Sequence, residues 1–405
     1  MWESEDEEDI MRIAYIVPSL RPLGPVIVVR NLVEQMKAHG HECVVFYFDE
    51  TTDGMTFACE TRRISFWKRI DTKGFDWIHT HCFRPMVYGL TLRNVKKITT
   101  LHSYLFTEYE YALGKFVGPL LGRFTMWVAR HYNKVAVLSM DAKEYYSRCI
   151  PREKLEVCYN GVAIERNDDD YDDDYDLFPT MTMTSSHDDH DDLTEHEDTK
   201  TQRFNNNGDW ERIKEFKGED VLIGCICELA KIKNVDLVVR AMRLLPEKFR
   251  LLLIGSGDEK KALLALANNI GVGERVLFLG ERPEAHRFLP LVDVFAMTSK
   301  SEGFCLALTE AAMYGKRIVC AEIPGMREKY SDDEVTYFDV YSEEALVKAI
   351  LLAEQDEEKA EMACAKAKKE FSAERMCERY LKVYQHFLLK VNGSRLLVKG
   401  YWVIG

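Results

Sequence analysis

Two glutamates, eight residues apart, bracket the stretch of this sequence with the clearest chemical potential. Glu302 is followed directly by Gly303, and Glu310 lies further on in an apolar segment of helical composition. A carboxylate accepts hydrogen bonds from two neighbouring hydroxyls, which suits the diol of a sugar or a ribose. Gly303 would let the backbone approach a ligand closely. The spacing by itself is equally compatible with two solvated glutamates at the start of a helix.

The predicted elements around this stretch place it at the end of a strand. A strand is predicted at 292–297 and a helix at 306–314. In an open parallel sheet, ligands bind beyond the carboxyl ends of the strands. A helix N-terminus at that edge offers free backbone N–H groups and partial positive charge, which suits a phosphate. The stretch is therefore a candidate for binding hydroxyl groups and phosphate together.

Strands and helices alternate on both sides of an interruption. The first half has predicted strands at 12–17, 43–48, 77–79, 97–101 and 134–138, and helices at 26–39 and 117–132. The second half has predicted strands at 221–227, 250–254, 276–279, 292–297 and 317–321, and helices at 235–245, 259–271, 306–314 and 343–355. Such alternation is typical of doubly wound parallel sheets.

We therefore predict an α/β protein with two doubly wound, Rossmann-like domains facing a central cleft. The segments are an acidic extension at 1–10, a first domain at 11–162, an acidic disordered insertion or linker at 163–215, a second domain at 216–372, a helix at 373–390 that crosses back to the first domain, and a tail at 391–405. The insertion is rich in Asp, Thr and Asn and cannot bury enough apolar surface to order itself.

The charge of the chain is concentrated in one segment. The net charge is −13, and residues 165–201 hold 15 acidic and 2 basic residues, which accounts for all of it. The rest is close to neutral and has no basic stripe of the kind that binds nucleic acid. His187, His190 and His196 lie among these aspartates, but a metal site is not expected in a tract that is not preorganised.

Composition favours a cytoplasmic protein. No run of about 18 apolar residues is present, so no membrane-spanning helix is expected. The acidic N-terminus lacks the basic and apolar pattern of a signal peptide. The eleven cysteines are scattered, and we interpret them as reduced and mostly buried.

The order of the motifs resembles that of the retaining family 4 glycosyltransferases, which have the GT-B fold. Glu302-Gly303-Phe304 followed by Glu310 is similar to their signature. Other matches, in the family's order, are Gly24 in the first strand-to-helix loop, His102 after a strand, Asn160-Gly161-Val162, Lys233-Asn234-Val235-Asp236-Leu237 and Gly255-Ser256-Gly257. The resemblance covers about 11–162 and 216–390. It implies a first domain that binds the acceptor and a second that binds a nucleotide-diphosphate sugar.

The resemblance also implies a role for each matching residue. Glu310 would bind the ribose hydroxyls, and Lys233 would neutralise the leaving diphosphate. Glu302, with the backbone N–H groups of Gly303, Phe304 and Cys305, would hold the donor sugar and diphosphate. The remaining site residues are His102 near the donor sugar, Gly24 near the diphosphate and Gly255 in the glycine turn. No metal, no other cofactor and no dedicated nucleophile are expected.

Two departures from the family pattern keep other functions open. Glu228 stands where such enzymes have an arginine, so either it points away and Lys231 or another cation substitutes, or donor binding is weakened. Pro25 follows a single glycine and has no N–H to donate. One alternative is therefore a catalytically impaired protein that binds sugar nucleotides. Another is a UDP-sugar 2-epimerase on the same fold, which the Glu-Gly-Phe motif disfavours.

Several other residues have both a functional and a plainer interpretation. His79 and His81 could line the acceptor cleft, although packing is the favoured interpretation, and Arg84 could meet an acidic acceptor or be a surface residue. The apolar stretch 114–132, with three basic residues, could lie on a membrane surface, but we favour a core helix. The expected partners are a sugar nucleotide, a glycan or lipid-linked acceptor and, at the periphery, the inner membrane face.

Overall fold

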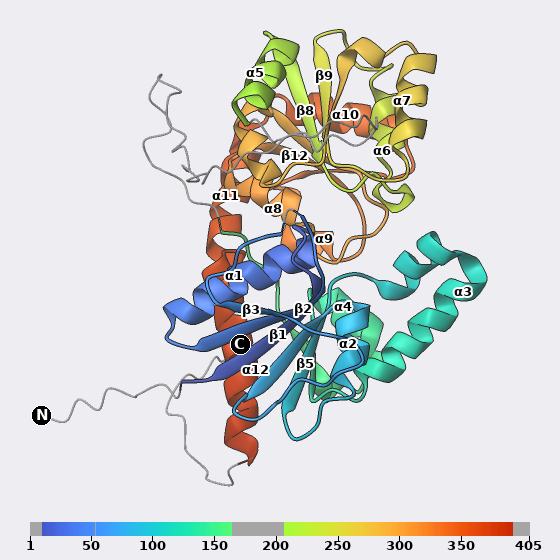
Figure 1. Cartoon of the computed structure of the whole chain (residues 1–405). Helices are drawn as coiled ribbons and strands as arrows, with labels where there is room; N and C mark the ends of the chain where they lie inside the picture. The colour runs from blue at the N-terminus through green and yellow to red at the C-terminus, as the bar shows by residue number, and fades with distance from the viewer. Residues whose placement is uncertain (1–9, 53, 164–205, 392–405) are drawn as a thin grey trace, which may run out of the picture.

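The computed structural model describes residues 10–52, 54–163 and 206–391. The acidic extension, the tail, most of the acidic insertion and its three histidines lie outside the described residues. The described chain forms two α/β units stacked one above the other (Figure 1).

The first unit is a seven-stranded parallel sheet in the order β3-β2-β1-β4-β5-β6-β7. Its strands are β1 (Arg12–Ser19), β2 (Glu42–Asp49), β3 (Glu60–Arg63), β4 (Trp77–His81), β5 (Lys96–Leu101), β6 (Lys134–Val137) and β7 (Leu155–Val157). Its helices are α1 (Gly24–Ala38), α2 (Phe83–Gly89), α3 (Leu105–Ala129), α4 (Met140–Ser147) and the short 3₁₀ helix η1 (Arg152–Lys154). The central strand β1 is buried from Ile13 to Val17, as expected of a parallel strand covered on both faces.

The second unit is a six-stranded parallel sheet in the order β10-β9-β8-β11-β12-β13. Its strands are β8 (Val221–Ile226), β9 (Phe249–Ile254), β10 (Val276–Gly280), β11 (Val294–Met297), β12 (Arg317–Ala321) and β13 (Thr336–Phe338). Its helices are α5 (Asn206–Lys217), η2 (Lys231–Lys233), α6 (Val235–Ala241), α7 (Lys260–Asn269), η3 (Gly273–Arg275), η4 (Ala285–Leu291), α8 (Leu306–Met313), α9 (Met326–Lys329), α10 (Glu343–Ala353) and α11 (Glu357–Glu370). Two doubly wound sheets confirm the predicted α/β fold class.

Helix α5 corrects the end of the predicted linker. Residues up to 215 were expected to be disordered, yet α5 begins at Asn206 and packs on the second sheet. Ile213 is fully buried there in a cluster with Leu222 and Leu252. The mostly polar composition of this segment does not indicate the apolar face of α5, because only three residues form that face: Trp210, Ile213 and Phe216.

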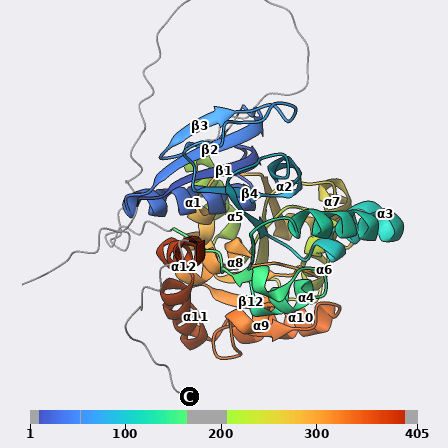
Figure 2. The same cartoon turned by 90° about the horizontal axis from the view of Figure 1, so that it is seen from below.

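The last helix joins the second unit to the first. Helix α12 (Ala373–Val391) follows α11 and lies along the first sheet beside α1 (Figures 1 and 2). Its Met376, Cys377 and Tyr380 are buried in the same cluster as Ile13 of β1. The chain passes closely where the units join, because a Cβ on Gly161 would lie 2.2 Å from the carbonyl oxygen of Ser372.

Helix α3 confirms the core interpretation of residues 114–132 for one part of the stretch, where Met126, Val128 and Tyr132 are buried, and contradicts it for the rest. The helix runs from Leu105, bends at Gly114, where φ is 81°, and returns as a second arm, so that it forms a hairpin projecting from the first unit (Figures 1 and 2). Phe116 is 93% exposed, and Val117, Leu120, Phe124 and Trp127 are exposed as well. The apolar period predicts the helix, but periodicity cannot show that the described residues leave one apolar face largely uncovered.

Candidate active site between the two units

A largely buried ion pair of Lys233 and Glu302 lies at the centre of the residues that the second unit brings to the interface. The Lys233 ammonium is 2.6 Å from the Glu302 carboxylate, which also accepts a hydrogen bond of 2.7 Å from Ser299. Burial alone would lower the pKa of Lys233, but the charge and hydrogen bond of Glu302 outweigh burial and raise that pKa. The lysine therefore remains a fixed positive charge beside Glu302.

Backbone hydrogen bonds bring these two residues together from distant parts of the sequence. Lys233 ends η2, the turn after β8, and Glu302 follows β11. The Thr298 hydroxyl donates to the Lys233 carbonyl at 2.8 Å, and the Lys300 N–H donates to the Ile232 carbonyl at 2.8 Å. Neighbouring parallel strands end at one edge of the sheet, so the loops that follow them meet there, as the sequence predicts.

Gly303 is required by its contact with the first unit. A Cβ at this position would lie 2.0 Å from the His102 carbonyl oxygen and 3.2 Å from the Ser103 Cα, both backbone atoms that cannot move aside cheaply. The Glu-Gly-Phe stretch therefore touches the loop after β5. This contact places His102 of the first unit next to Glu302 of the second.

The Phe304 side chain packs in the core, so only its backbone can face a ligand. Its ring is buried and contacts Phe371 edge-on, with centroids 5.4 Å apart. Lys329 lies over the other side of this ring, with its Nζ 5.4 Å from the centroid. Phe304 thus anchors the loop that carries Glu302 and Gly303.

Lys329 is a candidate site residue that sequence reasoning missed. It is fully buried, and its ammonium donates to the carbonyls of Gly303 at 3.1 Å and Gly325 at 2.8 Å. Burial lowers the pKa of Lys329 to about 8. Nothing local in Met326–Lys329 marks this lysine, because its partners come from another loop.

The start of α8 and the start of α1 approach each other across the interface. Cys305 precedes α8 in a left-handed conformation, with φ at 63°, and Leu306 begins the helix. A Cβ on Gly24, at the start of α1, would lie 3.7 Å from the Leu306 side chain. Two helix N-termini therefore point into one region, where their free N–H groups and partial positive charges suit a diphosphate.

Pro25 fits this arrangement better than the sequence alone suggested. It lies in the first turn of α1, where a backbone N–H would have no partner within the helix. The helix is not disturbed, but the Leu23 and Val26 N–H groups are already bonded to backbone carbonyls, so the Gly24 N–H is the donor that this first turn offers to a ligand.

Glu310 is a buried carboxyl on α8. Burial raises the pKa of Glu310 to about 7, although the positive charge of Arg30 on α1 acts in the opposite direction. A carboxyl that titrates near neutrality in an interface is more typical of a binding site than of a solvated helix start.

The glycine turn after β9 supports the same edge of the second sheet. Gly255 has φ of 142°, and a Cβ there would lie 1.8 Å from the Cys227 carbonyl oxygen. Only glycine lets this turn press against the loop after β8. Gly255 therefore positions the loop that leads to Lys233.

A chain of histidines lies behind the interface in the first unit. A His102 ring nitrogen is 2.8 Å from a nitrogen of His81, so one ring donates and the other accepts. His79 is bonded to Tyr384 of α12 and to Thr100, each at 2.8 Å. Burial lowers the pKa of His102 to about 3 and those of His79 and His81 well below the usual value, so these rings are neutral.

The three other polar candidates of the first unit, His79, His81 and Arg84, make structural contacts. His79 and His81 are completely buried, so neither lines an open cleft. Arg84 forms an ion pair of 2.7 Å with Asp49 and stacks over Phe48.

Glu228, the departure from the expected arginine, is exposed at the loop after β8. Its backbone carbonyl accepts from the Ala230 N–H at 2.9 Å and helps to shape that loop. Exposure removes the cost of a carboxylate buried against a diphosphate, because water can solvate it.

Glu328 links the two units directly. This residue of α9 accepts hydrogen bonds from the Met140 and Asp141 N–H groups at 2.7 and 3.1 Å, and from the Tyr159 hydroxyl. It thereby satisfies free N–H groups at the start of α4. The neighbouring Lys329 holds Gly303, so one short helix connects the first unit to the loop of Glu302.

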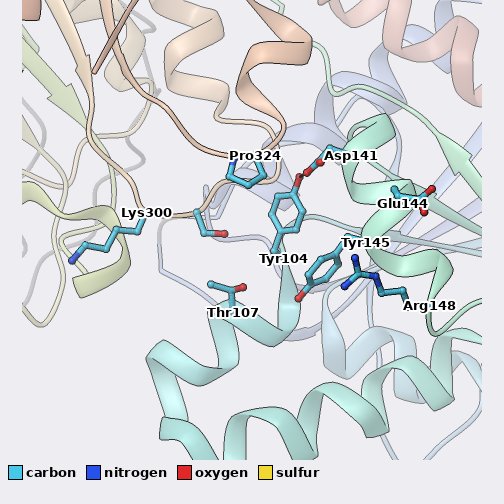
Figure 3. A pocket seen from close by; sticks show the side chains of 9 residues that line it. Tyr104, Thr107, Asp141, Glu144, Tyr145, Arg148, Lys300 and Pro324 are labelled. Carbon is cyan, nitrogen blue, oxygen red and sulfur yellow. Dashed lines mark hydrogen bonds between the residues drawn. The ribbon is translucent and has the colours of Figure 1, made fainter. Parts of the chain in front are cut away.

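A cavity of about 280 Å³ opens beside this link (Figure 3). Its lining from the first unit includes Tyr104, Thr107 and Tyr145, and from the second Lys300, Ser301 and Pro324. The rings of Tyr104 and Tyr145 meet edge-on, 5.1 Å apart, and the Tyr104 hydroxyl donates to Asp141 at 2.6 Å. Aromatic faces beside carboxylates and hydroxyls are suited to a sugar ring.

The described residues include no group of three or more potential metal ligands and no helix long and apolar enough to cross a membrane. All eleven cysteines are unpaired, and none is exposed.

Comparison with known proteins agrees with this geometry. Residues 24–166 match the Glycosyltransferase Family 4 model, and residues 206–370 match the Glycosyl transferases group 1 model. The chain is 27% identical, over 94% of its length and 100% of the relative, to the O-antigen biosynthesis glycosyltransferase WclY of Escherichia coli.

Two further comparisons add a relative whose name includes a diphospho-undecaprenol, and a solved structure. Over 30% of this chain and 34% of the relative, it is 32% identical to N-acetylgalactosamine-N,N'-diacetylbacillosaminyl-diphospho-undecaprenol 4-alpha-N-acetylgalactosaminyltransferase of Campylobacter jejuni. The crystal structure of Anabaena HepE in complex with UDP-glucose superimposes with a TM-score of 0.72 over 93% of this chain and 100% of HepE, at 17% identity. The chain therefore belongs to the GT-B glycosyltransferases, with a family 4 first domain and a group 1 second domain.

Proposed function

We propose that the enzyme transfers a hexose from a nucleotide-diphosphate sugar to a glycan or lipid-linked acceptor with retention of configuration. One observation carries the proposal most strongly. The buried pair of Lys233 and Glu302, the starts of α1 and α8, and His102 meet at one interface between the two units. These groups offer positive charge for a diphosphate and acceptors for hydroxyls within one site.

In this proposal the second unit holds the donor. The Glu310 carboxylate accepts from the ribose hydroxyls, and the N–H groups of Gly303, Phe304 and Cys305 donate to the diphosphate. Lys233 turns from Glu302 toward the diphosphate and stabilises the negative charge that grows as the sugar leaves. Glu302, freed in part, accepts from hydroxyls of the donor sugar. Gly255 and Lys329 keep the loops in place.

The chemical step is a displacement on one face of the sugar. The acceptor hydroxyl oxygen forms a bond to the anomeric carbon on the side from which the diphosphate departs. The anomeric carbon–oxygen bond breaks with its electron pair going to the phosphate oxygen, which takes the acceptor's proton. His102, held neutral by burial, hydrogen-bonds the sugar without becoming charged. No protein nucleophile and no metal are needed in this scheme.

Thermal unfolding with nucleotides tests the donor site. UDP is tried first, because HepE binds UDP-glucose, followed by GDP, ADP and their sugar conjugates. A ligand at about 100 times its dissociation constant adds roughly 2.7 kcal/mol to stability. One nucleotide should raise the unfolding temperature by about 5 °C. Glu310→Ala should abolish the shift, whereas Glu361→Ala, an exposed residue of α11, should retain it. No shift with any nucleotide contradicts the proposal.

A catalytically impaired sugar-nucleotide-binding protein is the second candidate. It is favoured by Glu228, which leaves the site without the family's second cation. The two functions differ in turnover. Incubation with donor and extracted acceptor lipids or glycans, followed by detection of released nucleotide, distinguishes them. Binding without release would favour the impaired protein, and release matched by glycosylated product supports the enzyme.

The biological setting is proposed from the relatives. WclY is named for O-antigen biosynthesis, and the Campylobacter enzyme for a diphospho-undecaprenol acceptor. We propose an acceptor of this class, a cytoplasmic enzyme and peripheral contact with a membrane. Unchanged transfer in the presence of a chelator would support the metal-free scheme.

A further inference from the structure

The projecting hairpin of α3 carries an apolar face that the described residues leave largely uncovered, although Phe124 at its inner end meets the Phe83 ring of α2 edge-on, with centroids 6.1 Å apart. Phe116, Leu120, Phe124 and Trp127 are spaced by four, four and three residues, which places them on one side of the helix. All four are exposed, with Phe116 at 93%. Phe124 and Trp127 stack with their ring centroids 5.8 Å apart. A continuous apolar face of this kind marks an interaction surface.

The exposure does not come from loose packing of the hairpin. Its two arms meet closely at glycines on the opposite side of the second arm. A Cβ on Gly118 would lie 2.6 Å from the backbone of Tyr109, and one on Gly122 would lie 2.5 Å from the Phe106 ring. Because these positions have no side chain, the arms lock together. The apolar face is presented outward by a well-packed support.

Charge identifies the kind of surface that this face fits. Lys115, Arg123 and Arg130 are exposed on the same arm, and Arg123 and Arg130 fall beside Phe116 at helical spacing. No Asp or Glu occurs between Glu110 and Asp141, although the whole chain has 67 acidic residues against 54 basic ones. An apolar face bordered by cations, without acidic residues, is complementary to an anionic lipid surface.

We propose that the hairpin of α3 docks on an anionic membrane, with Phe116, Leu120, Phe124 and Trp127 entering the headgroup layer and Arg123 and Arg130 meeting lipid phosphates. A second copy of the chain fits less well, because a symmetric contact would bring these cations together. The inference deepens the proposed function, since it names the surface that would face a membrane-held acceptor. Tyr104 and Thr107, at the start of α3, line the cavity beside the site, so docking would bring that cavity near the lipid.

Vesicle co-sedimentation of the full chain tests the proposal without requiring transfer. The probes are vesicles of phosphatidylcholine alone and of phosphatidylcholine mixed with phosphatidylglycerol. The chain should bind the mixed vesicles only. Phe116→Glu with Leu120→Glu should weaken binding more than tenfold, because two charges would enter the apolar boundary. Arg123→Gln and Arg130→Gln should each weaken it about fivefold.

Trp67→Glu is the matched control. Trp67 is 91% exposed and follows β3, on a different element from α3, so one added carboxylate there should alter binding less than twofold. Thermal unfolding of each variant verifies that it is folded. Three results would overturn the proposal: no binding of the wild-type chain to mixed vesicles, equal loss with Trp67→Glu, or a dimer that Phe116→Glu dissociates without affecting vesicle binding. UDP binding by the same samples tests the proposed function separately.

Discussion

The two sides of the candidate active site use polar groups in opposite ways. On the second-unit side, the groups are charged or titrate near neutrality. Lys233 is held protonated by Glu302, and burial brings the pKa of Glu310 to about 7 and that of Lys329 to about 8. On the first-unit side, His79, His81 and His102 are kept neutral by burial and bonded to one another or to hydroxyls.

This difference suggests a division of labour. A diphosphate needs positive charge, which must be compensated while the site is empty, and Glu302 provides that compensation for Lys233. A sugar ring needs neutral hydrogen-bond partners, which burial can supply without a counter-charge. Substitutions on the charged side should therefore have large effects, and those on the neutral side smaller ones.

The largest effect is expected for Glu302→Ala. Loss of this carboxylate leaves the Lys233 ammonium buried without its partner, which costs on the order of 3 kcal/mol of stability. The rate of transfer should fall by roughly 10²–10³-fold, because both sugar contact and lysine placement are lost. Denaturant unfolding and initial rates measure the two effects. Glu322→Ala is the control, since its ion pair with Arg327 is exposed and its loss should leave stability nearly unchanged. Equal effects for the two variants would refute the distinction between buried and exposed pairs.

Glu310→Gln should make the protein more stable above neutral pH. Burial raises the folded-state pKa of Glu310 to about 7, above its unfolded value near 4.5. The wild-type protein therefore loses stability as the pH rises from about 5 through 7, and by pH 8 the loss is on the order of 3 kcal/mol. Glutamine has no proton to lose, so the variant avoids this loss. Unfolding free energies at pH 5 to 8 measure the difference. A constant difference across that range would contradict burial as the cause.

Lys329→Met should weaken donor binding more than chemistry. The lysine donates to the Gly303 carbonyl and does not reach the reacting atoms in our scheme, so it is a positioning residue. We expect the donor KM to rise about tenfold and kcat to fall less than threefold, as for an interaction made equally in ground and transition states. Any change of donor KM near pH 8 in the wild-type enzyme should disappear in the variant. A drop in kcat alone would instead place Lys329 in the chemical step.

The smallest effect is expected for His102→Asn. Burial lowers the pKa of His102 to about 3, so it should not titrate between pH 5 and 8. The variant should therefore lower kcat/KM by about tenfold without changing the shape of its pH profile. A wild-type profile with a limb near 6.5 that vanishes in the variant would show that His102 acts as an acid or base.

Local patterns were enough to predict the fold and to bring Lys233 and Glu302 to one edge of the second sheet. Alternating apolar runs gave both parallel sheets, and Glu302, Gly303 and Lys233 belong to short motifs whose partners are fixed by neighbouring strand ends. For Gly303, the sequence predicts that the backbone comes close to another group, but it does not identify that group as His102. The contact joins residues about 200 positions apart, which spacing does not encode.

The sequence could not predict the roles of residues whose contacts are with distant parts of the chain. Lys329 and Glu328 look like an ordinary charged pair on a short helix, yet one is buried against Gly303 and the other reaches the first unit. The α3 stripe has the period of a core helix, and only the position of the hairpin shows that its face is open. The burial of Ile213 in α5 could not be predicted either, because its neighbours in the sequence are mostly polar and its packing partners lie in the second sheet.

The central claim is that Lys233 on the charged side binds the nucleotide diphosphate and that His102 on the neutral side contacts only the sugar. Calorimetric titration of UDP and of UDP-sugars, or of whichever nucleotide the unfolding assay selects, tests it on Lys233→Ala, His102→Ala and the control Lys348→Ala, an exposed lysine of α10. We predict that Lys233→Ala weakens UDP binding by about tenfold or more, that His102→Ala weakens only the sugar conjugate, and that Lys348→Ala changes neither. Unchanged UDP affinity in Lys233→Ala, or an equal loss for UDP and its conjugate in His102→Ala, would contradict the account.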